Sequence, residues 1–208
     1  MSTTAHGAAT VRWIAFEGPR LLASGAPSDV ASRVKQAFDE DPHAAVLVFD
    51  AGSSERIELS WHGSLQDVLR QLPPIAQEIA EPAPEPVAPR GRGRPKLGVV
   101  AREVTLLPRH WEWLNAQPGG ASVALRKLVE EARRVHAGRD LARQSRESAY
   151  RFMSAMGSNL ENFEEASRAL FAGDRARFAS LLRPWPAAIR EHLLGLAAAS
   201  FAAAPSPD

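Results

Sequence analysis

Prolines are concentrated in one stretch of this chain, and that stretch limits how the rest of it can fold. Seven of the 16 prolines among its 208 residues fall between Pro73 and Pro95. Proline fixes its own backbone angle and lacks an amide hydrogen, so it interrupts helices and sheets and favours extended polyproline geometry. We therefore expect residues 73–98 to form a semi-rigid linker that separates residues 1–72 from the remainder.

The segment before the linker, residues 1–72, is expected to be a small α+β domain. Short apolar runs, either continuous or alternating with polar residues, predict strands. Two further runs carry apolar residues at helical spacing, the first with Val30, Val34 and Phe38 on one face. A helix packed against an antiparallel sheet is the economical arrangement of such elements. The expected order is strand, strand, helix, strand, strand and helix, over residues 11–18, 20–25, 27–41, 44–50, 55–61 and 65–72.

The charge of the chain is divided unevenly, although the whole sequence sums to only +1. Residues 1–89 hold 6 basic and 12 acidic side chains, residues 90–151 hold 14 and 6, and residues 152–208 hold 5 and 6. The strongly basic middle segment would attract a polyanion such as DNA, and the acidic first segment would repel it. The alternative is an interaction module whose basic centre docks on an acidic protein surface, either its own N-terminal part or a partner.

A basic cluster closes the linker. Arg92, Gly93, Arg94 and Pro95 resemble the core of an AT-hook, a motif that binds the minor groove of DNA. Glycine adds no side chain and proline keeps the backbone extended, so this strip fits a narrow AT-rich groove, whose negative potential favours arginine. The residues expected to bind there are Arg90, Arg92, Gly93, Arg94, Pro95 and Lys96. The alternative interpretation is a basic linker whose charge only keeps it in solution.

The next segment, residues 99–137, has a strand pattern, a helix that starts at Pro108, a Pro-Gly-Gly turn and a longer helix. This order resembles the ribbon-helix-helix DNA-binding fold. The resemblance implies a homodimer, because two chains pair their strands into an antiparallel ribbon that enters the major groove. It also implies that amides at the start of the longer helix hold a DNA phosphate. The residues implied at this phosphate are Gly120, Ala121, Ser122, Arg126 and Lys127.

The expected strand, residues 99–107, favours non-specific or AT-biased binding over the reading of bases. Residues on the outer face of such a ribbon contact base edges and are usually polar or basic. Here one face carries Arg102 with two apolar residues, and the other carries Glu103, Thr105 and Leu107. Neither face is typical of a reading surface, so binding of the DNA backbone, with Arg102 among the contacts, fits better. The alternative is that a strand with apolar groups on both sides is buried under helices or the N-terminal domain. A unit of under about 40 residues also buries little apolar surface alone, which indicates a dimer or another support.

Residues 138–208 are expected to form a helical bundle. Gly138 would allow a break after the preceding helix. Asn159 and Asp174 are plausible caps for two of the helices that follow. Trp185 lies between two prolines, which predicts a rigid corner between the last two helices.

Five segments are similar to those of a known group of proteins. They are AFEGPRLLASG, AVLVFD, GRPKLGVVAREVTLLPRHWEWL, AYRFMSAM and LFAGDRARFASLL. Together they resemble a bacterial family with a domain of unknown function, DUF2239, across nearly the whole chain. The resemblance implies that the three regions belong to one bacterial protein, and it implies no activity.

Nothing in the sequence predicts a reaction. The six histidines are scattered, and the chain has no His-x-x-x-His pair, P-loop, dinucleotide-binding or nucleophile-elbow motif. We therefore expect a protein that is not an enzyme, with no cofactor, metal or small-molecule substrate. The lack of cysteine, of a signal peptide and of an apolar run of about 20 residues indicates a cytoplasmic protein without a membrane segment.

Overall fold

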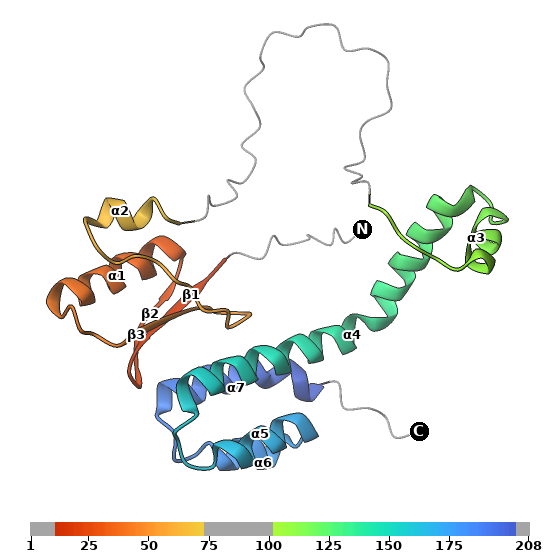
Figure 1. The fold of residues 1–208 in the computed structure, drawn as a ribbon. Coiled ribbons are helices and arrows are strands. Elements are labelled where there is room, and N and C mark those ends of the chain that lie inside the picture. Colours follow the sequence, from red (N-terminus) through yellow and green to blue (C-terminus); the bar gives the residue numbers. More distant parts are fainter. Residues whose placement is uncertain (1–10, 73–101, 203–208) are drawn as a thin grey trace, which may run out of the picture. The chain divides into compact units, whose positions relative to one another are not determined.

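The computed structural model of the protein describes residues 11–72 and 102–202 (Figure 1). The chain divides into two compact units, one of residues 1–73 with 137–208 and the other of residues 74–136. The linker expected over residues 73–98, with its basic cluster, lies outside the described residues. No helix in the described ranges has an apolar stretch long enough to cross a membrane.

A small antiparallel sheet lies at the centre of the first unit. Its strands are β1 (Trp13–Glu17), β2 (Arg20–Gly25) and β3 (Val46–Asp50), in the order β2-β1-β3. The hairpin between β1 and β2 turns at Gly18, whose φ of 54° is a backbone conformation that glycine adopts without strain. The expected α+β class with a small N-terminal antiparallel sheet is confirmed.

One face of the sheet is covered by α1 (Pro27–Glu40) and α2 (Leu65–Leu69). Trp13 and Ala15 of β1 and Val48 of β3 pack there with Val30 and Val34 of α1. These five side chains are almost completely buried. The helix spacing read from the sequence therefore placed the correct side of α1 against the sheet.

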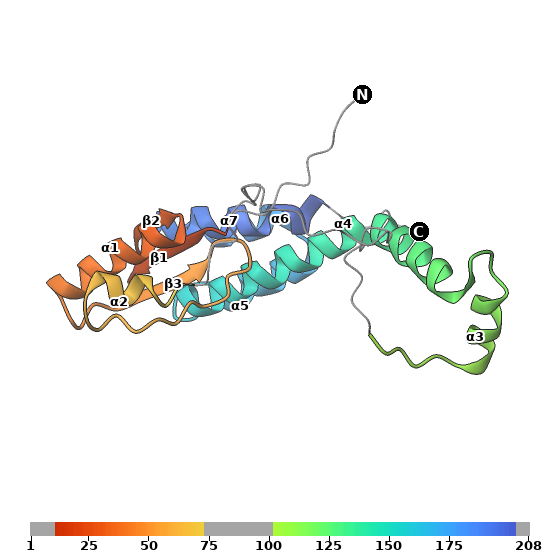
Figure 2. The same cartoon turned by 90° about the horizontal axis from the view of Figure 1, so that it is seen from above.

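The other face is covered by the C-terminal part of α4 (Gly120–Gly157) and by α7 (Ala187–Ala202). Helices α5 (Phe163–Ala172) and α6 (Arg175–Leu181) pack on the side of these two helices that faces away from the sheet (Figures 1 and 2). Ile14 and Phe16 of β1 and Phe49 of β3 share a core with Phe152 of α4 and Leu193 of α7. Successive residues of β1 thus point into different cores. The N-terminal and C-terminal regions, expected as separate parts, form one unit around the sheet.

The expected corner at Trp185 joins α6 to α7 and is almost completely buried. The indole Nε1 donates a hydrogen bond of 2.7 Å to the carbonyl of Glu161. The same ring lies against Gly157, the last residue of α4, where a Cβ atom would overlap it. Any side chain at position 157 would collide with this ring, so glycine is required there for the packing of Trp185.

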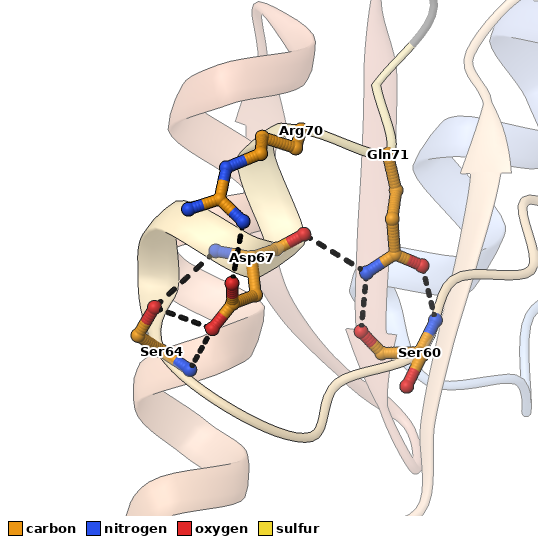
Figure 3. A network of polar contacts seen from close by, with 5 residues as sticks. All are labelled: Ser60, Ser64, Asp67, Arg70 and Gln71. Atoms are coloured by element: carbon orange, nitrogen blue, oxygen red, sulfur yellow. Dashed lines mark hydrogen bonds and ion pairs between the residues drawn. The ribbon is translucent and has the colours of Figure 1, made fainter.

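The fourth strand expected over residues 55–61 is wrong. A single bridge joins Phe49 to Arg56, and regular pairing ends there. Farther along, the side chain of Gln71 makes the backbone hydrogen bonds to Ser60 that a neighbouring strand would otherwise make (Figure 3). Gln71 Nε2 donates to the carbonyl of Ser60 and Gln71 Oε1 accepts from its amide, both at 2.9 Å. The alternation of apolar residues over 55–61 thus comes from side chains that pack beneath an irregular segment, and not from pairing in a β-sheet.

The start of α2 is fixed by a capping box (Figure 3). The amide and the hydroxyl of Ser64 donate to the carboxylate of Asp67 at 2.9 and 2.6 Å, and the amide of Asp67 donates back to the hydroxyl. The hydrogen bonds from Ser64, with a smaller contribution from Arg70, lower the pKa of Asp67. Ser64 thus caps α2, which ends at Leu69, three residues before the end of the helix expected over residues 65–72.

The second unit is described from residue 102. Residues 102–107 belong to no helix or strand, and α3 (Pro108–Asn115) and the first turns of α4 follow. Both expected helices are present, and α4 continues through Gly138 without a break. Residues 102–107 have no strand partner within the described ranges, so the paired ribbon stays a prediction.

Candidate nucleic-acid interface

The residues predicted to bind DNA fall into two groups. Those of the AT-hook-like cluster, Arg90 to Lys96, lie outside the described residues. The structure brings Gly120, Ala121, Ser122, Arg126 and Lys127 together on the first two turns of α4. Arg102 is exposed in the segment before α3, and no hydrogen bond or ion pair joins it to another described residue.

The start of α4 is built by two glycines. Gly119 and Gly120 have φ values of 90° and 73°, in the left-handed region that other residues avoid. A Cβ atom on Gly119 would also lie 3.1 Å from the side chain of Val123. The amide of Gly120 donates to the carbonyl of Gln117 at 2.9 Å, which closes the turn. This geometry explains why the Pro-Gly-Gly sequence ends α3 and lets α4 begin.

The first amides of α4 have no cap from a side chain, because the preceding residue is Gly119. Helix-start amides lack partners inside the helix and carry the positive end of the helix dipole. Within the described ranges, the amides of Ala121 and Ser122 donate to no other group outside the helix. An anion could therefore accept from both, as phosphates do at other helix N-termini.

Two exposed cations lie one turn farther along α4. Arg126 Nε donates to the carbonyl of Ser122 at 3.1 Å, so its side chain folds back toward the start of the helix. Neither Arg126 nor Lys127 forms an ion pair with any described residue. The next two arginines differ, since Arg133 and Arg134 pair with glutamates three residues earlier at 3.0 and 2.8 Å. Arg126 and Lys127 thus bring uncompensated positive charge to the N-terminal end of α4.

The second unit also exposes large apolar side chains, a feature that the sequence patterns did not single out. Those more than 45% exposed are Val104, Leu107, Trp113, Leu128, Val129 and Val135. Leu114 and Ala124 are its only buried hydrophobic residues among those described. Leu125, Leu128 and Ala132 lie on one side of α4, and their helical spacing is the sequence signal that indicates an apolar face there. Exposed apolar helix faces of this kind commonly mark interaction surfaces.

Comparisons with known proteins give one match. The model of a family described as an uncharacterized protein conserved in bacteria, DUF2239, matches residues 12–197. Neither the search of curated proteins nor the search of solved structures found a match. The matched range includes the sheet, the linker, α3 and α4 to α6 with most of α7. The chain therefore belongs to the bacterial family DUF2239.

Proposed function

We propose that this protein binds DNA as a homodimer and catalyses no reaction. The observation that carries the proposal is the start of α4, where uncapped amides and two unpaired cations lie together. Amides at a helix N-terminus and flexible cations suit phosphate oxygens, and they carry no information about base sequence. The binding is therefore non-specific or AT-biased, in the cytoplasm.

The AT bias is assigned to the linker. Arg92 and Arg94, separated by a glycine and followed by a proline, match the chemistry of a narrow minor groove. These residues lie outside the described ranges, so the support for this step is the sequence alone. The folded part of the second unit would hold the DNA backbone while the linker lies in the adjacent groove.

The dimer is supported by the exposed apolar residues of the second unit. Trp113 of α3 and Leu128 and Val135 of α4 are about half exposed or more, with fractions of 53%, 47% and 61%. Only two apolar residues are buried in the described part of this unit, residues 102–136, which is too small a core for a folded domain. A second copy would cover these residues and would also supply the missing partner of residues 102–107. Light scattering at several concentrations should show a dimer, and a strict monomer would contradict this part.

Salt dependence of binding to an AT-rich duplex tests the DNA contact. Each neutralised phosphate lowers the slope of log K against log salt by about 0.9, so six contacts predict a slope near −5. A flat response, or no binding, would favour the alternative in which the basic centre meets an acidic protein surface.

A matched pair of double variants separates specific contacts from overall charge. Arg126→Ala with Lys127→Ala should weaken binding and make the slope shallower by about 1.8, since two phosphate contacts are lost. Arg133→Ala with Arg134→Ala removes the same charge from the same helix, but these side chains already pair with Glu130 and Glu131. The control should have a much smaller effect, and equal effects would exclude a localised site on α4.

A third variant tests the linker. Replacing Arg92 and Arg94 by alanine should abolish the preference for AT-rich over GC-rich duplexes while part of the binding remains. Unchanged preference would show that the groove contact is assigned to the wrong residues.

A further inference from the structure

The first unit contains a cavity of about 800 Å³. It lies between the loop that follows β3, the C-terminal part of α4 and helix α7. Its volume is in the range of sites that hold small organic ligands. None of its lining residues belongs to the proposed DNA interface, so it requires its own explanation.

The rim of the cavity is acidic. Glu55 of the loop, Glu147 of α4 and Glu191 of α7 all line it. Glu147 is paired with Arg143 at 3.1 Å, whereas Glu55 and Glu191 form no ion pair with any described residue. The lining arginine, Arg151, donates to the backbone carbonyl of Ser53 and is thereby held at the loop. Two carboxylates from different elements thus line one cavity, and neither forms an ion pair with a described residue.

Ser148 gives the second and independent indication of a ligand. This residue lines the cavity and is only 6% exposed, yet its hydroxyl has no hydrogen-bond partner among the residues that the structure describes. Its neighbour Ser145 is nearly as buried, but its hydroxyl donates to the carbonyl of Leu196 and accepts from the amide of Ser200 at 3.0 Å. Buried hydroxyls are normally paired, so Ser145 is structural and Ser148 is left for a guest.

Helix α7 lines the cavity partly with residues that have little or no side chain. Gly195, Ala198 and Ala199 line the cavity from this helix. A glycine inside a helix costs about 1 kcal/mol relative to alanine, and it needs a compensating reason. At Gly195 a Cβ atom would meet no other group within 4 Å, so packing within the protein does not demand glycine there. Open space above this residue leaves room for the body of a ligand.

We propose that this cavity binds a small organic cation, an ammonium or guanidinium group on a short aliphatic or aromatic body. Glu55 and Glu191 attract the charge, the hydroxyl of Ser148 accepts a hydrogen bond from it, and the small residues of α7 contact the body. Charge-assisted hydrogen bonds of this kind are stronger than neutral ones.

Titration of the full-length protein with benzylamine and agmatine, followed by NMR or calorimetry at fixed ionic strength, tests the proposal. Both probes should bind saturably, and benzyl alcohol and benzoate, which match benzylamine in size, should not. Binding of the neutral or anionic probe with equal affinity would overturn the charge assignment. Absence of binding by both cations up to about 10 mM, the weak limit of a specific small site, would overturn the site itself.

Substitutions in the cavity test which residues bind the cation. Ser148→Ala and Glu191→Gln should each weaken binding about tenfold, because a hydrogen bond to a charged group is lost. Gly195→Leu should place a branched side chain in the part of the cavity lined by α7 and weaken binding while the circular dichroism stays native. Glu164→Gln, on an exposed residue of α5 outside the cavity, is the matched control and should bind as the unmodified protein does. Full binding by Gly195→Leu would show that the probes bind elsewhere.

Discussion

Replacing Phe152 by alanine should weaken the first unit as a whole, because this ring joins the helices to the sheet. Phe152 is fully buried, and its ring centroid lies 5.4 Å from that of Phe16, 5.5 Å from that of Phe49 and 4.6 Å from that of His192. Truncation of a buried phenylalanine costs about 3–5 kcal/mol. Three aromatic contacts are also lost, and each is worth about 0.5–1.5 kcal/mol in addition to the burial of apolar surface area. The expected decrease in the free energy of unfolding is therefore near about 5 kcal/mol, the upper end of this range for a buried phenylalanine.

Urea unfolding followed by circular dichroism and by tryptophan fluorescence measures this loss. With a slope of about 2 kcal/mol per molar, the midpoint should fall by about 2.5 M, with both signals in one transition. Phe171→Ala is the control, since that ring is 52% exposed and should cost under about 1 kcal/mol. A small loss for Phe152→Ala, or a second transition in which the sheet remains folded, would refute a core shared between β1 and α4.

Three further changes test local features of the same unit. Gly157→Ala should cost about 1–3 kcal/mol in chemical unfolding, because the new methyl group overlaps the buried ring of Trp185. Ser64→Ala should lower the free energy of unfolding by about 1 kcal/mol through loss of the cap of α2. Burial lowers the pKa of His192 below its usual 6.5, so the unfolded state takes up the proton more readily. The stability that His192 contributes is present above pH 6.5 and lost as the pH falls below it, and His192→Leu should flatten this part of the stability–pH curve.

Controls for these variants lie elsewhere on α4. Gly138→Ala occupies the same helix as Gly157→Ala, but its methyl group would meet nothing within 4 Å. It should stabilise the helix by up to about 1 kcal/mol, and a loss like that of Gly157→Ala would contradict the packing explanation. His136 is an exposed histidine of α4, and His136→Gln is the matched control for His192→Leu. A flattened curve for that control would show that His192 is not the group responsible.

The sheet could be predicted from the sequence because short apolar runs and a glycine turn leave few alternatives for residues 13–25. The second layer could not be predicted, although β1 contained a signal for it. Trp13, Ile14, Ala15 and Phe16 are four consecutive apolar residues, and such a run indicates a strand buried on both faces. The alternation at residues 55–61 predicted a strand that is absent. Alternating apolar residues indicate which side chains are buried, but they do not show whether the backbone pairs with another strand.

The start of α4 could be predicted because one local signal, Pro-Gly-Gly, ends one helix and is followed at once by the next. The cavity could not, since its carboxylates come from positions 55, 147 and 191, which no local pattern connects. Ser148 lies within the charged run RQSRESAY and has the appearance of a surface residue. Only the packing of α4 against α7 reveals that one serine of this run is engaged and the other is free.

The exposed part of α4 is the strongest physical reason to expect a second copy. Every residue from 126 to 141 is exposed, so this stretch of helix receives no support from packing within the described chain. Its ion pairs at three-residue spacing, such as Arg133 with Glu130, add only about 0.2–0.5 kcal/mol each. An isolated helix of this length is marginal in water. Leu128 and Val135, seven residues apart on one face, would instead stabilise the helix if another apolar surface covered them. The same contact that completes the helix would bring two open N-termini and four unpaired cations into one DNA-binding assembly.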